Sequence, residues 1–361
     1  LARWHEAVGP VMGWDGATAQ SRGERLGQAL EERAYLADLA SRPLLLTLMA
    51  TLHTSWGQLP EDRADLYEES VKLLLSRWQR AREVRRPDGE VETEQGIARV
   101  LAAEEESIRT ALHHLAFRAH EDQGAAADRD RGPADIGAGT VVAAFAPLLP
   151  EDFNPQVLLG YLETRAGLLV GRTPGTYAFP HRSFQEYLAA CHLAALRRFN
   201  LRAKELAAES VDWREVLNLA VGTLAFNQNN REKAFDAVEA VLPDRLPAVV
   251  DEAAWRQVWL AGEMCATIGR PAAERDEVGK AILPRLRDLL VALLENEALT
   301  PAQRAEAGDA LGKLGDPRPG VCTLEPHLIE IPAGDFLYGD EKETRTIGQP
   351  FAIARYPVTV A

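Results

Sequence analysis

The sequence predicts a mostly α-helical protein built from several parts, with one β-hairpin near its middle and a β-containing segment at its end. Apolar residues recur at helical spacing through most of the chain up to about residue 320. Two short apolar runs flank Thr173-Pro174-Gly175-Thr176, where Gly175 supplies the positive φ of a type II turn. After Cys322 the chain becomes rich in β-branched and aromatic residues, which favours strands.

The composition is that of a soluble globular protein. The 361 residues are 46% hydrophobic and 26% charged, enough for two or three domains. A net charge of -14 argues against nucleic acid as a general partner. No apolar run reaches the roughly 18 residues of a membrane span. The spacing of Cys191, Cys265 and Cys322 matches no zinc or redox pattern and suits a reducing cytoplasm. We therefore expect a cytoplasmic protein that binds neither nucleic acid nor membrane.

Residues 1–58 are expected to be helical. Pro43 suits the first turn of a helix, and Ser41 is available as its cap. One apolar helical face is expected to be buried, made of Leu44, Leu45, Leu48 and Leu52.

Residues 59–198 combine helices with the hairpin, which is the outline of a winged-helix domain. The basic run Arg77–Arg86 is interpreted as a solvated helix end and loop. Residues 94–120 are expected to be helical again.

A histidine precedes the helix that follows the hairpin. Ser183 and Glu186 form an S-x-x-E capping-box pattern, so Ser183 is expected to cap this helix and Glu186 to reach back. His181 would then lie two residues before the cap, at the positive end of the helix, where an anion such as phosphate is a natural partner. The alternative is a loop histidine that is exposed or bonded to a backbone carbonyl. The buried face is predicted to contain Phe184, Tyr187, Leu188 and Cys191.

Residues 199–322 are expected to be helical throughout. In the last helix Ala307, Ala310, Leu311 and Leu314 share one face, Gly315 stops the helix and Pro317 prevents its continuation. Small-residue helices ending in Gly-Asp-Pro resemble HEAT-type repeats, which implies an α-solenoid-like array.

Three motifs in residues 1–195 resemble the NACHT-type ATPases of the signal-transducing (STAND) class. "FPHRSFQEYLAA" is similar to the end of their winged-helix domain, and "RPLLLTLMA" to a segment of their helical domain. "LPEDRADLYEESVKLLLSRW" is similar to the linker and first helix between them. Arg42 stands where this family commonly has Asn. The resemblance implies that residues 1–58 are the helical domain of a NACHT module and that residues 59–198 are its winged-helix domain.

The resemblance also implies roles for two residues. Pro43 would pack on the adenine of a bound nucleotide, and His181 would bond the β-phosphate of ADP and hold the module closed. Exchange of ADP for ATP, prompted by an unknown trigger ligand, would open the module and let it self-oligomerise. A role in bacterial defence or signalling is the guess that this class suggests.

The chain contains no G-x-x-x-x-G-K-[ST] sequence. We therefore expect the P-loop, with its Mg and hydrolytic residues, to lie upstream of Leu1 in cis. By this reading the longer parent is an ATPase that holds ADP or ATP with Mg, whereas this chain alone holds no cofactor and shows no ATPase activity. No catalytic or metal-binding residue is predicted here, since G-x-S-x-G, H-E-x-x-H and C-x-x-C are missing from the sequence and His113-His114 is interpreted as ordinary surface and core.

The stretch "IEIPAGDFLYGDEKETRTIGQPFAIARYPVT" resembles the opening of formylglycine-generating-enzyme-like (sulfatase-modifying factor) domains, which have an α+β, C-type-lectin-like fold. Tyr338 replaces their usual Met, and Pro357 stands before Val358-Thr359. Residues 323–361 would be the truncated start of such a domain.

Three functions are compatible with these observations. The first is a nucleotide-gated switch with the winged helix as gate, the helical repeats as spacer or sensor, and the tail as recognition head. The second is the scaffold of a sulfatase-modifying-factor-like enzyme, with oxidative cysteine or non-haem iron chemistry in the tail domain. The third, a DNA-binding winged helix, is disfavoured because "SFQEYLAACHLAAL" is too apolar for a groove and the wing has only Arg172.

Overall fold

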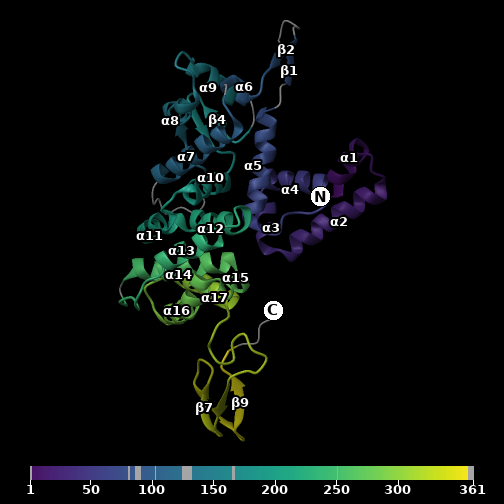
Figure 1. The fold of residues 1–361 in the computed structure, drawn as a ribbon. Helices are drawn as coiled ribbons and strands as arrows, with labels where there is room; N and C mark the ends of the chain where they lie inside the picture. The colour runs from purple at the N-terminus through teal and green to yellow at the C-terminus, as the bar shows by residue number, and fades with distance from the viewer. Residues whose placement is uncertain are drawn as a thin grey trace. The chain divides into compact units, whose positions relative to one another are not determined.

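The structure is a computed structural model that describes residues 2–79, 82–85, 91–101, 103–123, 132–164, 167–249 and 251–356 (Figure 1). The chain divides into two compact units, residues 1–240 and 241–361. This division falls inside the range expected to form helical repeats. Among the helices of the described residues, none has the length and apolar character needed to cross a membrane.

The first unit begins with four helices: α1 (Ala2–Met12), α2 (Gly16–Glu32), α3 (Ala34–Ala40) and α4 (Pro43–Trp56). Helix α4 starts at the proline, as predicted, but its N-cap is Arg42, which makes no side-chain cap bond. The expected cap at Ser41 is therefore wrong, because the proline ring already fixes the backbone of the first turn. Of the predicted apolar face, Leu45, Leu48 and Leu52 are buried, whereas Leu44 is 36% exposed.

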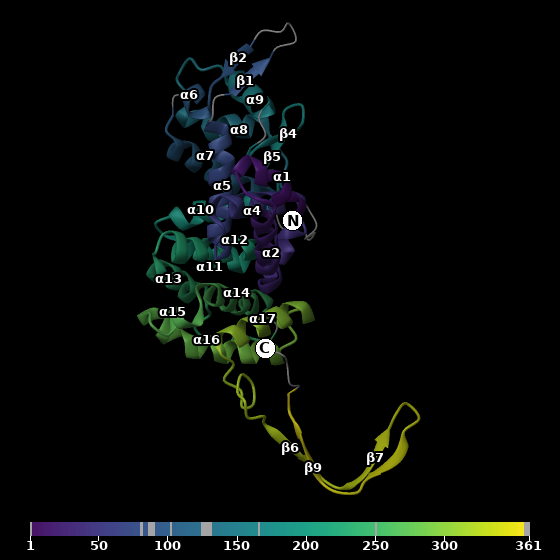
Figure 2. The ribbon, with the colours of Figure 1, turned by 90° about the vertical axis from the view of Figure 1, so that its right-hand side faces the viewer.

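The winged-helix region follows, and its elements in chain order are α5 (Arg63–Gln79), β1 (Arg82–Arg85), β2 (Val91–Glu94), α6 (Ile97–Leu101), α7 (Glu105–Gln123), β3 (Ile136–Gly137), α8 (Ala138–Phe145), the short 3-10 helix η1 (Ala146–Leu148), α9 (Pro155–Thr164), β4 (Val170–Thr173), β5 (Thr176–Ala178) and α10 (Arg182–Ala195). Strands β3, β5 and β4 form an antiparallel sheet in that order. Figure 2 shows the β4–β5 hairpin beside α8 and α9. The predicted hairpin is confirmed, with Gly175 at φ 75 in its turn.

One local prediction in this region is wrong for part of its range. The basic run Arg77–Arg86 was expected to be a helix end and loop, but Arg82–Arg85 pairs antiparallel with Val91–Glu94. The other residues of the run that follow α5 lie outside the described part. The helical structure expected over residues 94–120 is confirmed for most of that range, as the two helices α6 and α7, whereas Glu94 belongs to β2. A new helix starts at Glu105 because two acidic residues there favour a helix N-terminus.

The first unit ends with α11 (Phe199–Glu209), the 3-10 helix η2 (Val211–Trp213), α12 (Arg214–Gly222), the π-helix η3 (Thr223–Asn227) and α13 (Arg231–Val241). Helix α10 lies at the centre and packs against α5, α7 and α12. Its predicted inner face is confirmed, because Phe184, Tyr187, Leu188 and Cys191 are all buried.

The second unit contains α14 (Glu252–Ile268), α15 (Arg270–Ala273), α16 (Glu277–Glu295), α17 (Pro301–Leu314), β6 (Leu328–Ile331), β7 (Gly334–Tyr338), β8 (Glu343–Ile347) and β9 (Phe351–Ala354). Helix α17 packs on α14 and α16. Its predicted face of Ala307, Ala310, Leu311 and Leu314 is buried, and the helix ends at Gly315 with φ 89. These helices have their own core, but the solenoid arrangement stays a prediction.

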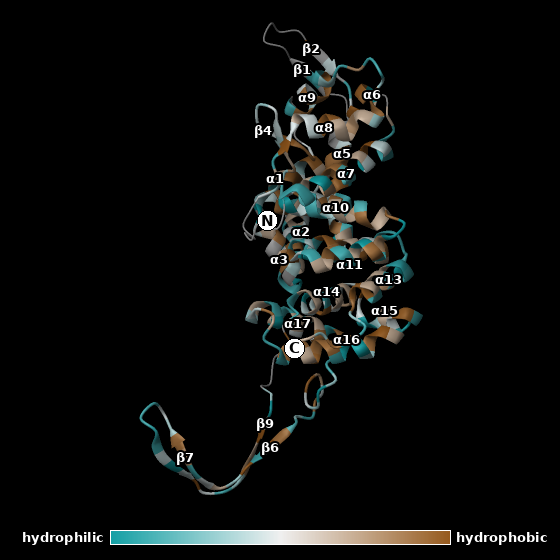
Figure 3. Ribbon diagram, turned by 90° about the vertical axis from the view of Figure 1, so that its left-hand side faces the viewer, coloured by the Kyte–Doolittle hydropathy of each residue, from teal (hydrophilic) through white to brown (hydrophobic). Residues whose placement is uncertain are grey.

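The tail is β-structured, as its composition predicted. Strand β6 pairs with β9, and β7 pairs with β8. Figure 3 shows hydrophobic segments in these strands, and large apolar side chains such as Leu337, at 65% exposure, face solvent. The positions after Tyr356, including Val358-Thr359, lie outside the described residues. The lectin-like assignment of residues 323–361 stays a prediction.

Candidate functional site at the start of helix α10

His181 is itself the N-cap of α10. Its backbone is extended, with φ -155 and ψ 149, and its Nδ1 accepts a hydrogen bond from the backbone N–H of Ser183 at 3.1 Å. The Ser183 hydroxyl lies 2.8 Å from the same nitrogen. The predicted capping box is therefore wrong. Ser183 lies inside the helix, and Glu186 does not reach back but accepts from the Arg182 guanidinium at 2.8 Å.

This cap determines where the imidazole carries its proton. Because Nδ1 accepts from a backbone N–H, it must be deprotonated, so the proton of the neutral ring is on Nε2. Burial and then the positive charge of Arg42 lower the pKa of His181. The half-buried ring is therefore neutral at pH 7 and offers one Nε2–H donor. The helix dipole adds positive potential at the same place.

Pro43 lies at the first position of α4, in an exposed turn that also contains Arg42. Since the Arg42 guanidinium acts on the His181 ring, this turn lies within electrostatic reach of the start of α10. Arg42, the residue directly before Pro43, therefore adds positive potential at the His181 ring.

Helix α5, which lies beside α10 and α12 (Figure 1), contacts α7, α10 and α12 through side chains that the sequence did not indicate. Arg63 pairs with Glu215 of α12 at 2.7 Å. Tyr67 stacks on Tyr187 of α10 with ring centroids 5.5 Å apart and meets the edge of Phe184 at 5.9 Å. The only signal in the sequence was the presence of polar residues between the apolar positions of α5.

Glu68 of α5 is the centre of a second set of bonds. Both of its oxygens lie 2.9 Å from one Arg109 nitrogen, and one accepts from the Tyr187 hydroxyl at 2.8 Å. Burial raises the pKa of Glu68, but the Arg109 and Tyr187 bonds outweigh it and leave this pKa below its usual value. Glu68 is therefore ionised and holds α5, α7 and α10 together by charge-assisted bonds.

Glu186 has the opposite character. Burial and then the neighbouring Glu215 carboxylate raise the pKa of Glu186 to about 7, although Arg182 and Arg63 oppose this rise. The Glu186 carboxyl, in the second turn of α10, thus titrates near neutrality. Its state depends on charges from α5 and α12 as well as from its own helix.

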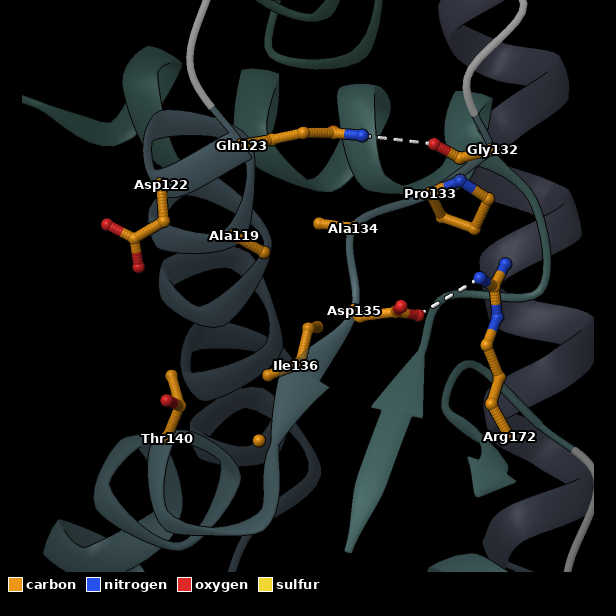
Figure 4. Close-up of a pocket in the computed structure, with 11 residues that line it drawn as sticks. Ala119, Asp122, Gln123, Gly132, Pro133, Ala134, Asp135, Ile136, Thr140 and Arg172 are labelled. Atoms are coloured by element: carbon orange, nitrogen blue, oxygen red, sulfur yellow. Dashed lines mark hydrogen bonds and ion pairs between the residues drawn. The ribbon is translucent and has the colours of Figure 1, made fainter. Parts of the chain in front are cut away.

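A separate hollow of about 310 Å³ lies between the end of α7 and strand β3 (Figure 4). Its Arg172 pairs with Asp135 at 3.0 Å, and the Gln123 amide donates to the Gly132 carbonyl at 3.1 Å. Neither His181 nor Pro43 lines it. Because its arginine is already paired with a carboxylate, the hollow is a poor site for an anion.

The order of the elements changes which helix would be the recognition helix in the DNA-binding alternative. In the order α7, β3, α8, α9, β4, β5, the helix before the hairpin is α9, whereas "SFQEYLAACHLAAL" belongs to the central helix α10. Helix α9, with sequence PQVLLGYLET, contains no Lys or Arg. In the described part of the chain, no three His, Cys, Asp or Glu residues are grouped to hold a metal ion.

Residues 63–193 match the family model of the winged helix-turn-helix domain C-terminal to NACHT. The matched range runs from the start of α5 into α10, covers about a third of the chain and includes His181. It indicates a NACHT-associated signalling protein. No curated protein matches the chain.

Proposed function

We propose that this chain is the gate of a nucleotide-controlled signalling switch of the NACHT class, closed by ADP and opened by ATP. The observation that carries the proposal is the N-cap at His181, which commits the ring proton to Nε2 at the start of a helix. The match of residues 63–193 to a winged helix that follows NACHT domains supports it.

In this proposal His181 donates its Nε2–H to the β-phosphate of ADP, and Pro43 packs on the adenine. A P-loop domain in cis, upstream of this chain, holds the remaining phosphate contacts and Mg. Release of the His181 contact on exchange for ATP frees α10 and permits self-oligomerisation. The helices of residues 199–322 act as HEAT-like spacer or sensor, and the tail acts as a lectin-like recognition head.

The cap allows the proposed bond between His181 and the β-phosphate to be tested separately from the effect of His181 on the fold. Serine is a good N-cap but has no group that replaces Nε2–H, whereas alanine provides neither function. We would prepare the longer protein with its nucleotide domain as wild type, His181→Ser and His181→Ala. Rates of ADP release would then be measured together with thermal unfolding.

A hydrogen bond to a charged group contributes about 1.5–3 kcal/mol, so both variants should release ADP roughly 10- to 150-fold faster. Only His181→Ala should also lose stability, by about 0.5–2 kcal/mol. Equal rates of ADP release from wild type and His181→Ser would refute the proposed bond between His181 and ADP.

A further inference from the structure

The first turn of helix α5 is attached to the helices that follow the winged-helix region. Arg63 pairs with Glu215 of α12, with side-chain exposures of 36% and 26%. Two residues further on, Asp65 accepts from the Asn227 amide of η3 at 2.6 Å. The η3 segment is a π-helix, a rare conformation that is frequent at functional sites. Two polar contacts therefore tie the first turn of α5 to α12 and η3.

One turn further along, α5 is attached to the first turns of α10. Tyr67 packs against Phe184 and Tyr187, and Glu68 accepts from the Tyr187 hydroxyl. Phe184 is only three residues from the N-cap His181, in the same helical turn. A shift of α5 relative to α10 must therefore be accommodated where the imidazole is held.

The charges give Arg63 two possible carboxylate partners. In this structure it pairs with Glu215, but it also acts electrostatically on Glu186 of α10. Glu186 is bonded to Arg182, the residue directly after His181. If Glu215 moved away, Arg63 would be drawn to Glu186 and would compete with Arg182 for it. The rearrangement would occur one residue from the gate histidine.

We propose that α5 couples α12 to the gate, so that a displacement of α12 that breaks the Arg63–Glu215 pair shifts the first turn of α10 and with it His181. The consequence for nucleotide rests on the function proposed above. The coupling between Glu215 and His181 does not, and it can be measured without nucleotide.

A charge-swap cycle tests the coupling in the 361-residue chain. The variants are Arg63→Glu, Glu215→Arg and the double swap, with ¹³C-labelled histidine and the His181 signal assigned by its loss in His181→Gln. The Arg202–Glu121 pair is the matched control, because its exposures of 30% and 29% are similar and it joins α11 to α7. The same three swaps would be made there.

Each single swap at Arg63–Glu215 should shift the His181 signal and the double swap should restore it, whereas the control swaps should leave it in place. If a charge reversal prevents folding, Arg63→Lys and Glu215→Gln take its place, with a shift expected for Glu215→Gln. An unmoved His181 signal in the folded single variants overturns the coupling.

The longer protein with its nucleotide domain supplies the second readout. Coupling free energies between sites usually correspond to a factor of about five or more, so each single swap should speed ADP release at least about fivefold and the double swap should reverse this. Shifted His181 signals with unchanged ADP release would leave the coupling standing and overturn the proposed function of His181.

Discussion

Acidification is expected to destabilise the first unit through His120 of α7. This side chain is 5% exposed, its Nε2–H donates to the Asp212 carbonyl at 3.2 Å, and its ring lies 4.7 Å from Trp213. Burial, and then the charge of Arg182, lower the pKa of His120 to about 4. Since an unfolded histidine has a pKa of about 6.5, the stabilisation is complete above that pH and is lost as the pH falls towards about 4.

The magnitude follows from these two pKa values. Between pH 7 and pH 5 the linkage relation gives a loss of about 2 kcal/mol from His120 alone. For a unit of this size that corresponds to a fall in Tm of roughly 4–8 °C. His120→Gln keeps an N–H donor for the Asp212 carbonyl but loses the imidazole ring that lies against Trp213, so it should be less stable than wild type at pH 7. Because glutamine does not titrate, the variant should lose less stability between pH 7 and pH 5.

The assay is urea unfolding of wild type and His120→Gln at pH 7 and pH 5. The comparison between the two proteins removes the contributions of all other groups, including Glu186, whose raised pKa acts in the opposite direction. The second unit contains only one histidine, His327, and its transition is an internal reference. Equal losses in the two proteins would refute the role of His120.

Four further substitutions have expected signs. Gly279→Ala should destabilise the second unit by about 1–3 kcal/mol, because the added Cβ would meet the Ala273 carbonyl oxygen at 2.6 Å, whereas Gly308→Ala should stabilise it by about 0.5–1 kcal/mol; thermal denaturation distinguishes these signs. Glu186→Gln should gain stability relative to wild type as the pH rises from 5 to 8, because burial above all makes the charged carboxylate costly; urea unfolding at both pH values would show no such trend if the carboxyl were solvated. Thr300→Ala should cost about 1 kcal/mol in the same thermal assay by removing the capping box of α17, and an unchanged Tm would contradict it.

The features that the sequence predicted well depend on neighbouring residues. Gly175 in the hairpin turn and Gly315 after α17 both adopt the positive φ that their sequence context indicated. The buried faces of α10 and α17 follow directly from helical spacing. Pro43 likewise marked the start of α4.

The missed features depend on competition between partners. The S-x-x-E pattern predicted a cap at Ser183, but the imidazole of His181 takes that place and Arg182 engages Glu186. The contact between Glu68 and Tyr187 joins residues 119 positions apart, and no local pattern specifies such a pair. Helical periodicity finds which face is buried but not which polar side chains meet there.

The π-helix η3 makes the fold depend on the number of residues in this segment, which a deletion would test and a substitution would not. The Gln228 N–H bonds to the Thr223 carbonyl five residues earlier, so this turn contains one residue more than an α-helical turn. Deleting a residue between Leu224 and Phe226 would allow a regular α-helix, but Asn227 would then turn by about 100° about the axis. Its amide would leave Asp65, and α13 would rotate with it. The extra residue therefore works as a spacer that keeps the two ends of this helical segment in phase with α5.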